Sequence, residues 1–372
     1  MIIGLDGTTL LGGKTGIGNL TENLFNALAD LKKAHHFKIF SNTGIHWTNS
    51  LPKISVCCRG NFPIRFIWMQ CILPYLIYKE KLDIFHFTNY LAPLMCPCPY
   101  IITISDMTIF TVPDFHTFRR RILHQSLLSI LAKRSKAITT ISEYSKQDII
   151  KILKVPPEKI TVIYLAPHPI FKPIYNADEL LRVRKKYLLP DKFILHVGTL
   201  EPRKNLVRLI QAFHELKMES ETPHKLVLVG NKGWHFQPVF NTISKLNLSH
   251  EIIITEYVPL NDLPAIYSLA DILAYPSLYE GFGLPVAEAM ATGTPVVTSN
   301  TTSLPEVAGD AAVLIDPASI DSIKEGLKLL LNNENVRMSL MEKGLKRVKE
   351  FSWEKAAKET IYLYEKVYES FS

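Results

Sequence analysis

The 372-residue chain has few cysteines, and they follow no pattern that binds a metal or forms paired bridges. Its five cysteines lie at positions 57, 58, 71, 96 and 98. An odd number without paired spacing, and the lack of a signal peptide, argue against a disulfide-stabilised secreted protein. Cys96 and Cys98 have one residue between them, whereas zinc and redox motifs have two. We therefore expect a reducing, cytoplasmic compartment and no metal site.

The chain also lacks a hydrophobic run long enough to cross a membrane. Its richest stretch, residues 62–78, is interrupted by Arg65, Gln70 and Pro74. A spanning helix needs about 18 or more uninterrupted apolar residues. The stretch has the pattern of an amphipathic segment with a core face. Its aromatic edge either packs inward or contacts a membrane surface peripherally, and the sequence leaves both interpretations open.

Two phosphate-binding signatures are incomplete in the glycine-rich stretch 7–18. A Walker A motif requires a glycine where Thr8 stands, and the dinucleotide fingerprint G-x-G-x-x-G fits no register. The second failure disfavours a hydride-transferring dehydrogenase. What remains is a loop in which Gly16 and Gly18 present unhindered amides at a helix start. A merely tight strand-to-helix connection is the alternative.

Acidic residues are scarce in the first half of the chain. Residues 1–170 carry 19 lysines and arginines against 10 aspartates and glutamates, whereas the remainder carries 23 against 25. A basic half favours an anionic partner. Because no groove-reading motif is found, we expect no nucleic acid. An anionic membrane or a lipid-diphosphate acceptor fits better, with unpartnered surface lysines as the alternative.

Short buried strands alternate with helices along the chain, which is typical of an α/β protein with doubly wound parallel sheets. Such sheets bind ligands beyond the carboxyl ends of their strands. Residues 166–177 contain three prolines and are predicted to form an extended linker. The domains are therefore expected at 1–170 and 171–353. Predicted strands are 1–6, 37–40, 84–87, 100–104, 137–141, 160–164, 193–197, 226–229, 252–255, 271–275 and 294–299.

The stretch 271–299 is the most informative one. It predicts a buried strand, a glycine-bracketed loop, a helix with Pro285 in its first turn and Gly293 just past its end, and another strand. Such a loop directs backbone N–H groups and a helix N-terminus at an anion. Glu280 and Glu288 would repel a phosphate, so we expect them to accept hydrogen bonds from hydroxyl groups. Phosphate flanked by hydroxyls describes a nucleotide sugar.

A second loop, residues 198–205, carries Arg203 and Lys204 at a predicted helix start. Adjacent cations there oppose the helix dipole unless an anion offsets them. Arginine can bind two phosphate oxygens, and lysine supplies a point charge. We therefore predict that they bind a diphosphate leaving group, with a surface ion pair as the alternative.

The run EGFGLPVAE at 280–288, followed by AMATGTPVV, closely resembles the donor-site signature of retaining glycosyltransferase family 4. Further matching pieces occur in order along nearly the whole chain: GIGN, HFTNYLAP, ISEYSKQDI, HVGTLEPRKNL and VLVGNKGW. The resemblance is closest to bacterial mannosyltransferase-like enzymes of lipopolysaccharide and capsule assembly. It implies a GT-B fold, in which two Rossmann-like domains face each other across a cleft. The C-terminal helix, 354–372, would complete the first, acceptor-side domain.

The resemblance also implies roles for individual residues. Glu288 would bind the ribose, and Glu280 with the following amides would orient the sugar. The implied catalytic residues are Arg203, Lys204, Glu280 and Asp106. The implied donor site consists of Gly16, Gly18, Gly198, Arg203, Lys204, Gly230, Tyr257, Val258, Glu280, Gly281, Phe282, Gly283, Leu284 and Glu288. The implied acceptor side consists of His86, Asn89 and Ser105. Arg119 and Arg120 are assigned to the acceptor side from their charge, because arginines at a predicted helix start oppose the helix dipole. They either bind the phosphates of a lipid carrier or are solvated surface charge.

Two acceptor-side residues carry alternatives. His86 could equally be a hydrogen-bonded core histidine. Ser105 stands where relatives usually have a histidine, and a hydroxyl cannot carry charge near neutral pH. Either the histidine's role passes to Asp106 or His116, or this chain depends less on it.

The implied activity is retaining transfer of a hexose from a nucleotide-diphosphate sugar to a hydroxyl of a glycan or lipid-linked acceptor. GDP-mannose is favoured over a UDP-sugar, and the departing phosphate would take the acceptor proton in a front-face attack. No Asp-x-Asp motif sits in a plausible loop, so no metal is expected. The enzyme would be cytoplasmic, with peripheral contact at the inner membrane face. The alternatives are a GT-B sugar-nucleotide epimerase and a nucleotide-sugar-binding protein with little turnover.

Overall fold

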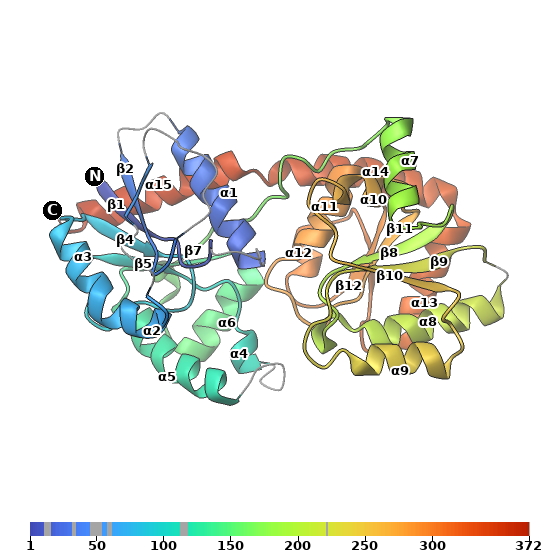
Figure 1. The fold of residues 1–372 in the computed structure, drawn as a ribbon, viewed down its shortest axis with the longest axis horizontal. Coiled ribbons are helices and arrows are strands. Elements are labelled where there is room, and N and C mark those ends of the chain that lie inside the picture. The colour runs from blue at the N-terminus through green and yellow to red at the C-terminus, as the bar shows by residue number, and fades with distance from the viewer. Residues whose placement is uncertain are drawn as a thin grey trace. The chain divides into compact units, whose positions relative to one another are not determined.

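The computed structural model of the protein describes residues 1–10, 16–31, 35–44, 54–57, 62–111, 118–220 and 222–371, with the backbone alone at 16, 54, 118–124 and 126. The chain forms two compact units, Met1–Leu165 with Ser352–Ser372, and Ala166–Phe351. Each unit contains one parallel sheet with helices around it (Figure 1). The predicted α/β class with two Rossmann-like parallel sheets is confirmed.

The sheet of the first unit has seven strands in the order β3-β2-β1-β4-β5-β6-β7. Neighbouring strands are parallel throughout. The elements of this unit are β1 (Ile2–Asp6), α1 (Gly16–Asp30), β2 (His36–Phe40), β3 (Ile54–Val56), α2 (Arg65–Ile67), the π-helical turn η1 (Trp68–Ile72), α3 (Leu73–Lys79), β4 (Ile84–Phe87), β5 (Tyr100–Thr103), α4 (Thr108–Thr111), α5 (Phe118–Arg134), β6 (Ala137–Thr140), α6 (Glu143–Leu153), η3 (Pro157–Lys159), β7 (Ile160–Val162) and α15 (Trp353–Glu369).

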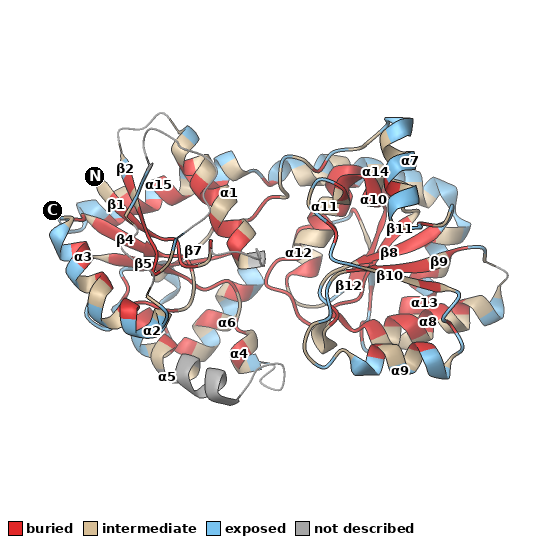
Figure 2. Ribbon diagram, in the orientation of Figure 1, coloured by how far each residue is buried: buried red, intermediate tan, exposed pale blue. Residues whose placement is uncertain are grey.

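Alternation along the strands covers both faces of this sheet. Phe85 and Phe87 of β4 pack into a cluster with η1, α3, α5 and α6. Ile84, one residue earlier, packs into a second cluster with α1 and α15. Successive strand side chains point to opposite faces, so a run of apolar residues buries both. Figure 2 shows the strands as the most deeply buried part of the unit.

The sheet of the second unit has six parallel strands in the order β10-β9-β8-β11-β12-β13. Its elements are α7 (Ala177–Lys186), β8 (Phe193–Val197), η4 (Pro202–Lys204), α8 (Leu206–Glu219), β9 (Lys225–Val229), α9 (Gln237–Lys245), β10 (Ile252–Glu256), α10 (Leu263–Leu269), β11 (Ile272–Tyr275), α11 (Leu284–Thr292), β12 (Val296–Ser299), α12 (Leu304–Ala308), β13 (Val313–Ile315), α13 (Ile320–Asn332), α14 (Glu334–Arg347) and η5 (Val348–Glu350).

The predicted strand, loop and helix around residue 280 are confirmed. Helix α11 begins at Leu284 with Pro285 in its first turn, and Gly293 ends it in the left-handed conformation. The helix after β1 begins at Gly16. Gly16 and Gly18 therefore lie in its first turn. Residues 11–15 of the same glycine-rich stretch lie outside the described residues.

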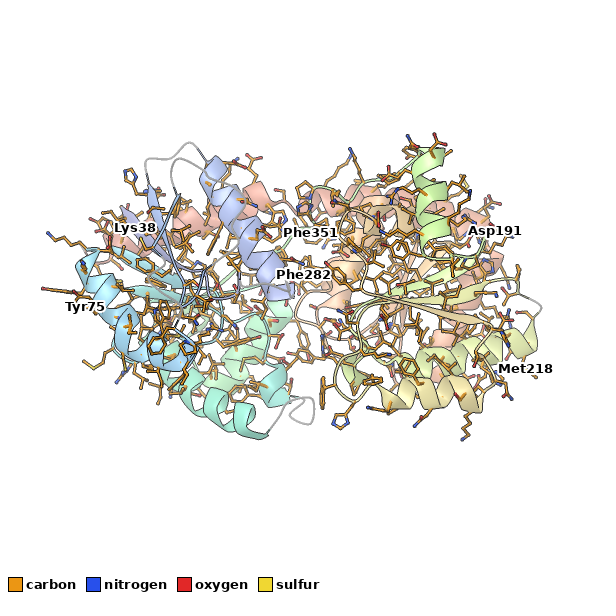
Figure 3. All side chains as sticks on the ribbon, in the orientation of Figure 1. Lys38, Tyr75, Asp191, Met218, Phe282 and Phe351 are labelled. Atoms are coloured by element: carbon orange, nitrogen blue, oxygen red, sulfur yellow. The ribbon has the colours of Figure 1, made fainter. Side chains whose placement is uncertain are left out.

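The predicted amphipathic segment is the run of helical turns α2, η1 and α3. Trp68, Met69 and Leu73 are buried in the core. Tyr75 and Tyr78 are 60 % and 75 % exposed, and Tyr75 projects outward in Figure 3. Among the described residues, no helix combines the length and the apolar composition that a membrane crossing requires.

Candidate functional site

The donor-side residues gather where the second sheet reverses its strand order. β8 and β11 are neighbours, but the chain continues from β8 to β9 on one side and from β11 to β12 on the other. Open α/β sheets bind ligands in the crevice at this switch point. The loops that follow the two strands are bonded together there. The amide of Leu278 donates to the carbonyl oxygen of Arg203 at 2.9 Å, and Ser277 Oγ lies 3.0 Å from the same oxygen.

Glu280 lies at the centre of the joined loops and is only 7 % exposed. Its carboxylate accepts four hydrogen bonds, from Arg203 Nη1 at 2.6 Å, Lys204 Nζ at 2.7 Å, Ser277 Oγ at 2.6 Å and Tyr275 OH at 2.9 Å. Burial raises the pKa of this carboxyl, but the two cations and the hydrogen bonds outweigh burial and hold the pKa well below its usual range. Glu280 is therefore ionised and fixes both cations. Its sugar-orienting role stays a prediction.

The half-buried Arg203 and the buried Lys204 form a cationic pair. Arg203 also donates to Glu201 Oε1 from Nε and Nη2, at 3.1 and 2.6 Å, and to the carbonyl of Tyr279 at 2.9 Å. Burial disfavours its charge, but Glu280 and Glu201 raise the pKa of Arg203 above its ordinary value. Burial and the charge of Arg203 lower the pKa of Lys204. Lys204 is 7 % exposed, so this is not the surface ion pair of the alternative interpretation.

Each cation keeps one N–H group without a partner among the described residues. Arginine has five such donors and lysine three. Arg203 makes four hydrogen bonds and Lys204 makes two, the second to Tyr275 OH at 2.5 Å. With Glu201 and Glu280 included, the cluster has no net formal charge. An anion would therefore be attracted by fixed, oriented N–H groups rather than by excess charge.

Two glycines of the predicted donor site are required by the backbone. Gly230 has a φ of +148°, and a Cβ on it would lie 2.1 Å from the carbonyl oxygen of Gly198. The ends of β8 and β9 therefore approach each other closely. Gly283 has a φ of +105°, and its Cβ would meet Leu304 at 2.6 Å. These positions exclude other residues whether or not a ligand binds.

The side chain of Ser303 supports the backbone of residues 280–283. Its hydroxyl bonds the carbonyl oxygens of Glu280 and Phe282, at 2.9 and 3.0 Å. Phe282 is buried and meets Phe351 edge-on, with ring centres 5.4 Å apart (Figure 3). Gly281, beside it, is buried as well, and Leu284 is the half-buried first residue of α11. The loop is thus rigidly supported.

Glu288 differs from Glu280 in having few partners. It lies half-buried on α11, where Tyr267 OH donates to its Oε2 at 2.8 Å. Burial raises the pKa of Glu288 to about 7, although the Tyr267 bond and Lys204 act in the opposite direction. Both protonation states are thus accessible near neutral pH. Of the remaining donor-side predictions, Tyr257 is exposed just after β10 and Val258 is buried.

Several residues of this cluster were missed by sequence reasoning. Besides Ser303, they are Tyr275, Ser277, Asn205 and His196. Asn205 adopts a φ of +60°, and its side chain donates to the carbonyls of Pro276 at 3.0 Å and Pro317 at 2.7 Å. His196 bonds the carbonyl of Ala274 at 2.9 Å through Nδ1, and burial lowers its pKa to about 4. Both residues lie in HVGTLEPRKNL, one of the pieces that match the family, and that match could have identified them as site residues.

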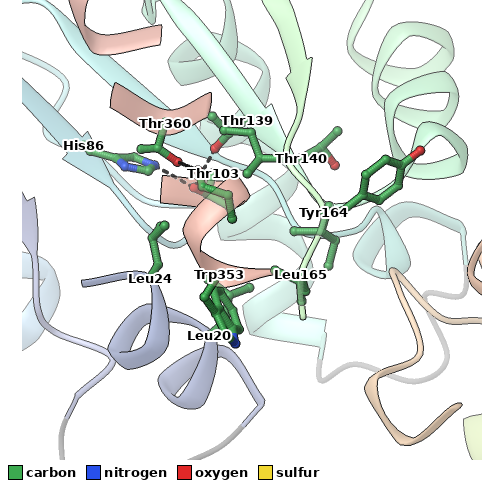
Figure 4. A pocket seen from close by; sticks show the side chains of 13 residues that line it. Leu20, Leu24, His86, Thr103, Thr139, Thr140, Tyr164, Leu165, Trp353 and Thr360 are labelled. Carbon is green, nitrogen blue, oxygen red and sulfur yellow. Dashed lines mark hydrogen bonds between the residues drawn. The ribbon is translucent and has the colours of Figure 1, made fainter. Parts of the chain in front are cut away.

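In the first unit, His86 is a core histidine. It is 1 % exposed, Nδ1 bonds Tyr364 OH at 2.7 Å and Nε2 bonds Thr103 Oγ1 at 2.8 Å. Burial lowers the pKa of His86 to about 3. A cavity of about 20 Å³ adjoins this network, lined by threonines that include Thr139 and Thr140 (Figure 4). That volume suits one water molecule and is too small for a sugar.

The other acceptor-side residues lie at the carboxyl edge of the first sheet. Asp106 Oδ1 accepts hydrogen bonds from the amide and the hydroxyl of Thr108, at 2.9 and 2.6 Å. Ser105 is buried, and Asn89 is half-buried in the loop after β4. The side chains of Arg119 and Arg120, and all of His116, lie outside the described residues.

Comparison with known proteins identifies the family. Residues 15–166 match the family model "Glycosyltransferase Family 4", and residues 181–347 match "Glycosyl transferases group 1". The chain is 32% identical over 372 residues to the O-antigen chain mannosyltransferase B of Escherichia coli, with 94% of this chain and 96% of that protein covered. The chain belongs to glycosyltransferase family 4. Its family and its relatives show that this protein is an enzyme, a glycosyltransferase. They do not favour the alternatives, an epimerase or a binding protein with little turnover.

Two further likenesses show less, the first because it covers only part of each chain and the second because its sequence identity is low. The serotype-specific mannosyltransferase WbdA of Escherichia coli is 33% identical over 232 residues, which are 60% of this glycosyltransferase and 28% of that longer protein. The solved structure of sucrose-phosphate synthase from Thermosynechococcus elongatus superposes with a TM-score of 0.78 over 99% of both chains, at 17% identity. The structural likeness concerns the GT-B fold alone.

Proposed function

We propose that this glycosyltransferase moves mannose from GDP-mannose to a hydroxyl of a lipid-linked glycan, with retention of the anomeric configuration. The observation that carries the proposal is the Arg203–Lys204–Glu280 cluster at the switch point of the second sheet. It supplies fixed N–H donors for a diphosphate. The choice of mannose rests on the relative named O-antigen chain mannosyltransferase B, which aligns along nearly the whole chain.

The leaving group would be stabilised by groups already in place. As the bond between the anomeric carbon and the phosphate oxygen breaks, negative charge grows on the diphosphate. The unused N–H groups of Arg203 and Lys204 would bind that charge without moving, because Glu280 holds both side chains. Preorganised donors of this kind are worth about 10²–10³ in rate each. Glu288 would accept hydrogen bonds from the ribose.

The transfer itself would proceed on one face of the sugar. The acceptor oxygen bonds the anomeric carbon on the side from which the phosphate leaves, and the acceptor proton passes to the departing phosphate oxygen. Glu280 is a poor nucleophile for a double displacement, because both its oxygens already accept hydrogen bonds. We expect divalent metal to be dispensable, so turnover that ceases with EDTA and returns with Mg²⁺ would contradict this part.

Purified enzyme supplied with GDP-mannose and a mannosyl-lipid acceptor tests the proposal. We expect an α-mannosyl product by NMR. Lys204→Ala should lower turnover about 10²-fold with little change in donor KM, whereas Glu288→Ala should mainly raise donor KM. Lys328→Ala, which removes a lysine paired with Glu219 on the surface of the same unit, is the matched control. Equal activity in all four proteins would contradict the site, and a β-product would contradict retention.

We also propose a peripheral contact between the first unit and the inner face of the cytoplasmic membrane. Tyr75 and Tyr78 expose aromatic rings on α3, and Lys79 and Lys81 lie beside them in the chain. Aromatic rings and cations together suit an anionic lipid surface. Tyr75→Ser with Tyr78→Ser should reduce cosedimentation with vesicles of anionic lipid. Equal cosedimentation of the variant and the wild type would contradict the contact.

A further inference from the structure

The first sheet has a switch point of its own, between β1 and β4. Its order, β3-β2-β1-β4-β5-β6-β7, places these strands side by side. The register pairs Leu5 of β1 with His86 of β4, so the residues that follow each strand emerge at the same edge. The hydroxyl of Thr88 donates to the carbonyl of Asp6 at 3.0 Å, which joins the two strand ends. Ligands bind at such crevices in open α/β sheets.

Asp6 places a buried carboxylate at this edge. It is 1 % exposed, and its Oδ1 accepts hydrogen bonds from the amide and the hydroxyl of Thr8, at 3.0 and 2.6 Å. Its Oδ2 has no hydrogen-bond partner among the described residues. The nearest cation is Arg65, whose Nη2 lies 3.7 Å from Oδ2, too far for a hydrogen bond. One oxygen is therefore fixed by Thr8 while the other is available.

Arg65 and Asn89 add further unused polar atoms. In the described part of the chain, Nε and Nη2 of Arg65 and Oδ1 of Asn89 are buried without a hydrogen-bond partner. Each such group costs about 1–3 kcal/mol when left unpaired. Native proteins leave few such groups, and each one needs an explanation, which an ordered water or a bound ligand can supply.

The segments that carry these atoms are held together. Gln70 of η1 donates to the carbonyl of Ala92 at 3.1 Å and accepts from the amide of Leu94 at 2.9 Å. It thereby fastens the loop that contains Asn89 to the helical segment that begins at Arg65. That segment contains the π-helical turn Trp68–Ile72, a rare geometry that recurs next to functional sites.

The chemistry of the set selects a class of ligand. A carboxylate oxygen and an amide oxygen accept hydrogen bonds, and a guanidinium donates them. A phosphate would be repelled by Asp6, and a metal cation would be repelled by Arg65. A sugar ring offers neighbouring hydroxyls that both donate and accept, and it needs no net charge. We propose that Asp6, Arg65 and Asn89 bind the hydroxyl groups of the acceptor sugar, an inference that rests on the proposed function.

Saturation-transfer NMR with methyl α-glycosides of mannose, glucose, galactose and N-acetylglucosamine tests the site without requiring turnover. We expect at least one glycoside to bind the wild-type enzyme. Asp6→Asn and Arg65→Gln should each raise the dissociation constant of that glycoside about tenfold, as expected when a hydrogen bond to a charged group is lost. Glu80→Gln, which removes the carboxylate of a Lys38 ion pair in the same unit, should leave binding unchanged.

The outcomes separate this site from the proposed function. Binding of GDP to the same samples reports on the second unit, so loss of GDP binding alone would contradict the donor assignment and leave the sugar site standing. No glycoside binding to the wild type would mean that water fills the Asp6 site, which would overturn the inference. Unchanged binding in both variants would overturn it as well. If Asp6→Asn fails to fold, the half-buried Arg65 still decides the test.

Discussion

The two switch points share one strand arrangement but differ in how their polar groups are satisfied. At the end of β11, Glu280 accepts hydrogen bonds from four side chains. At the end of β1, one carboxylate oxygen of Asp6 has no hydrogen-bond partner among the described residues. Two nitrogens of Arg65 likewise have none. Glu280 therefore holds other side chains in place, whereas Asp6 has an oxygen that can accept a hydrogen bond from a ligand.

The difference indicates two ways to prepare a site. The second unit fixes its cations before an anion arrives, so no side chain has to reorganise when charge develops. The first unit leaves hydrogen-bonding capacity open at a buried edge, where a ligand with hydroxyls would complete it. Three predictions test this comparison, and the first should have the largest effect.

Glu280→Ala should destabilise the enzyme by about 3–5 kcal/mol, because it leaves the buried Lys204 and the half-buried Arg203 without their shared partner. Asp6→Asn should change the free energy of unfolding by less than about 1 kcal/mol, because the amide oxygen can keep the Thr8 bonds and the Arg65 pair is long. Urea unfolding of both variants measures the contrast. Similar losses in the two would remove the distinction between the sites.

Glu288→Gln should stabilise the folded state at high pH only. The folded pKa of about 7 is above the ordinary value of 4.5, so the unfolded chain ionises first and stability is lost as pH rises through 7. The amide removes that loss, which gives roughly 1–3 kcal/mol at pH 8 and no gain at pH 4. Thermal unfolding across this pH range measures it. A constant difference at all pH values would show that Glu288 does not titrate as described.

Tyr364→Phe should cost about 1 kcal/mol by removing the hydrogen bond to His86. The Tyr364–His86 hydrogen bond is a buried polar pair of the first unit that is satisfied away from the switch point. Tyr362→Phe, at an exposed position of the same helix, is the control and should be neutral. A neutral Tyr364→Phe would mean that unpaired groups are tolerated throughout this unit, which would weaken the case for the Asp6 site.

The sequence predicted the parts of the fold that depend on local pattern. A few neighbouring residues are enough to predict a buried strand such as 272–275, or the start and end of α11 from Pro285 and Gly293. It did not predict the three-residue edge strands β3 (Ile54–Val56) and β13 (Val313–Ile315), whereas the equally short edge strand β7 was predicted from the longer run 160–164. Such strands depend on the neighbour with which they pair.

The site could be predicted as a set of residues but not as a network. The sequence placed Arg203, Lys204 and Glu280 at one ligand, yet it assigned Glu280 to the sugar. The hydrogen bonds that join Glu280 to the cations span 76 and 77 residues, and no local pattern encodes them. His86 shows the same limit, since its two partners are 17 and 278 residues away.

Nucleotide binding to the second unit is the most direct test of the central claim, that the Arg203–Lys204–Glu280 cluster holds a nucleoside diphosphate. Thermal unfolding would be followed with GDP, UDP, ADP and CDP, for the wild type and for Lys204→Ala. A ligand at about 100 times its dissociation constant stabilises the folded state by roughly 2.7 kcal/mol. GDP carries the full charge of the departed diphosphate, which Lys204 is proposed to bind, whereas the intact donor does not. We therefore predict that GDP produces this shift in the wild type and a much smaller one in Lys204→Ala. Stabilisation by none of the four nucleotides, or an equal shift in both proteins, would contradict the account.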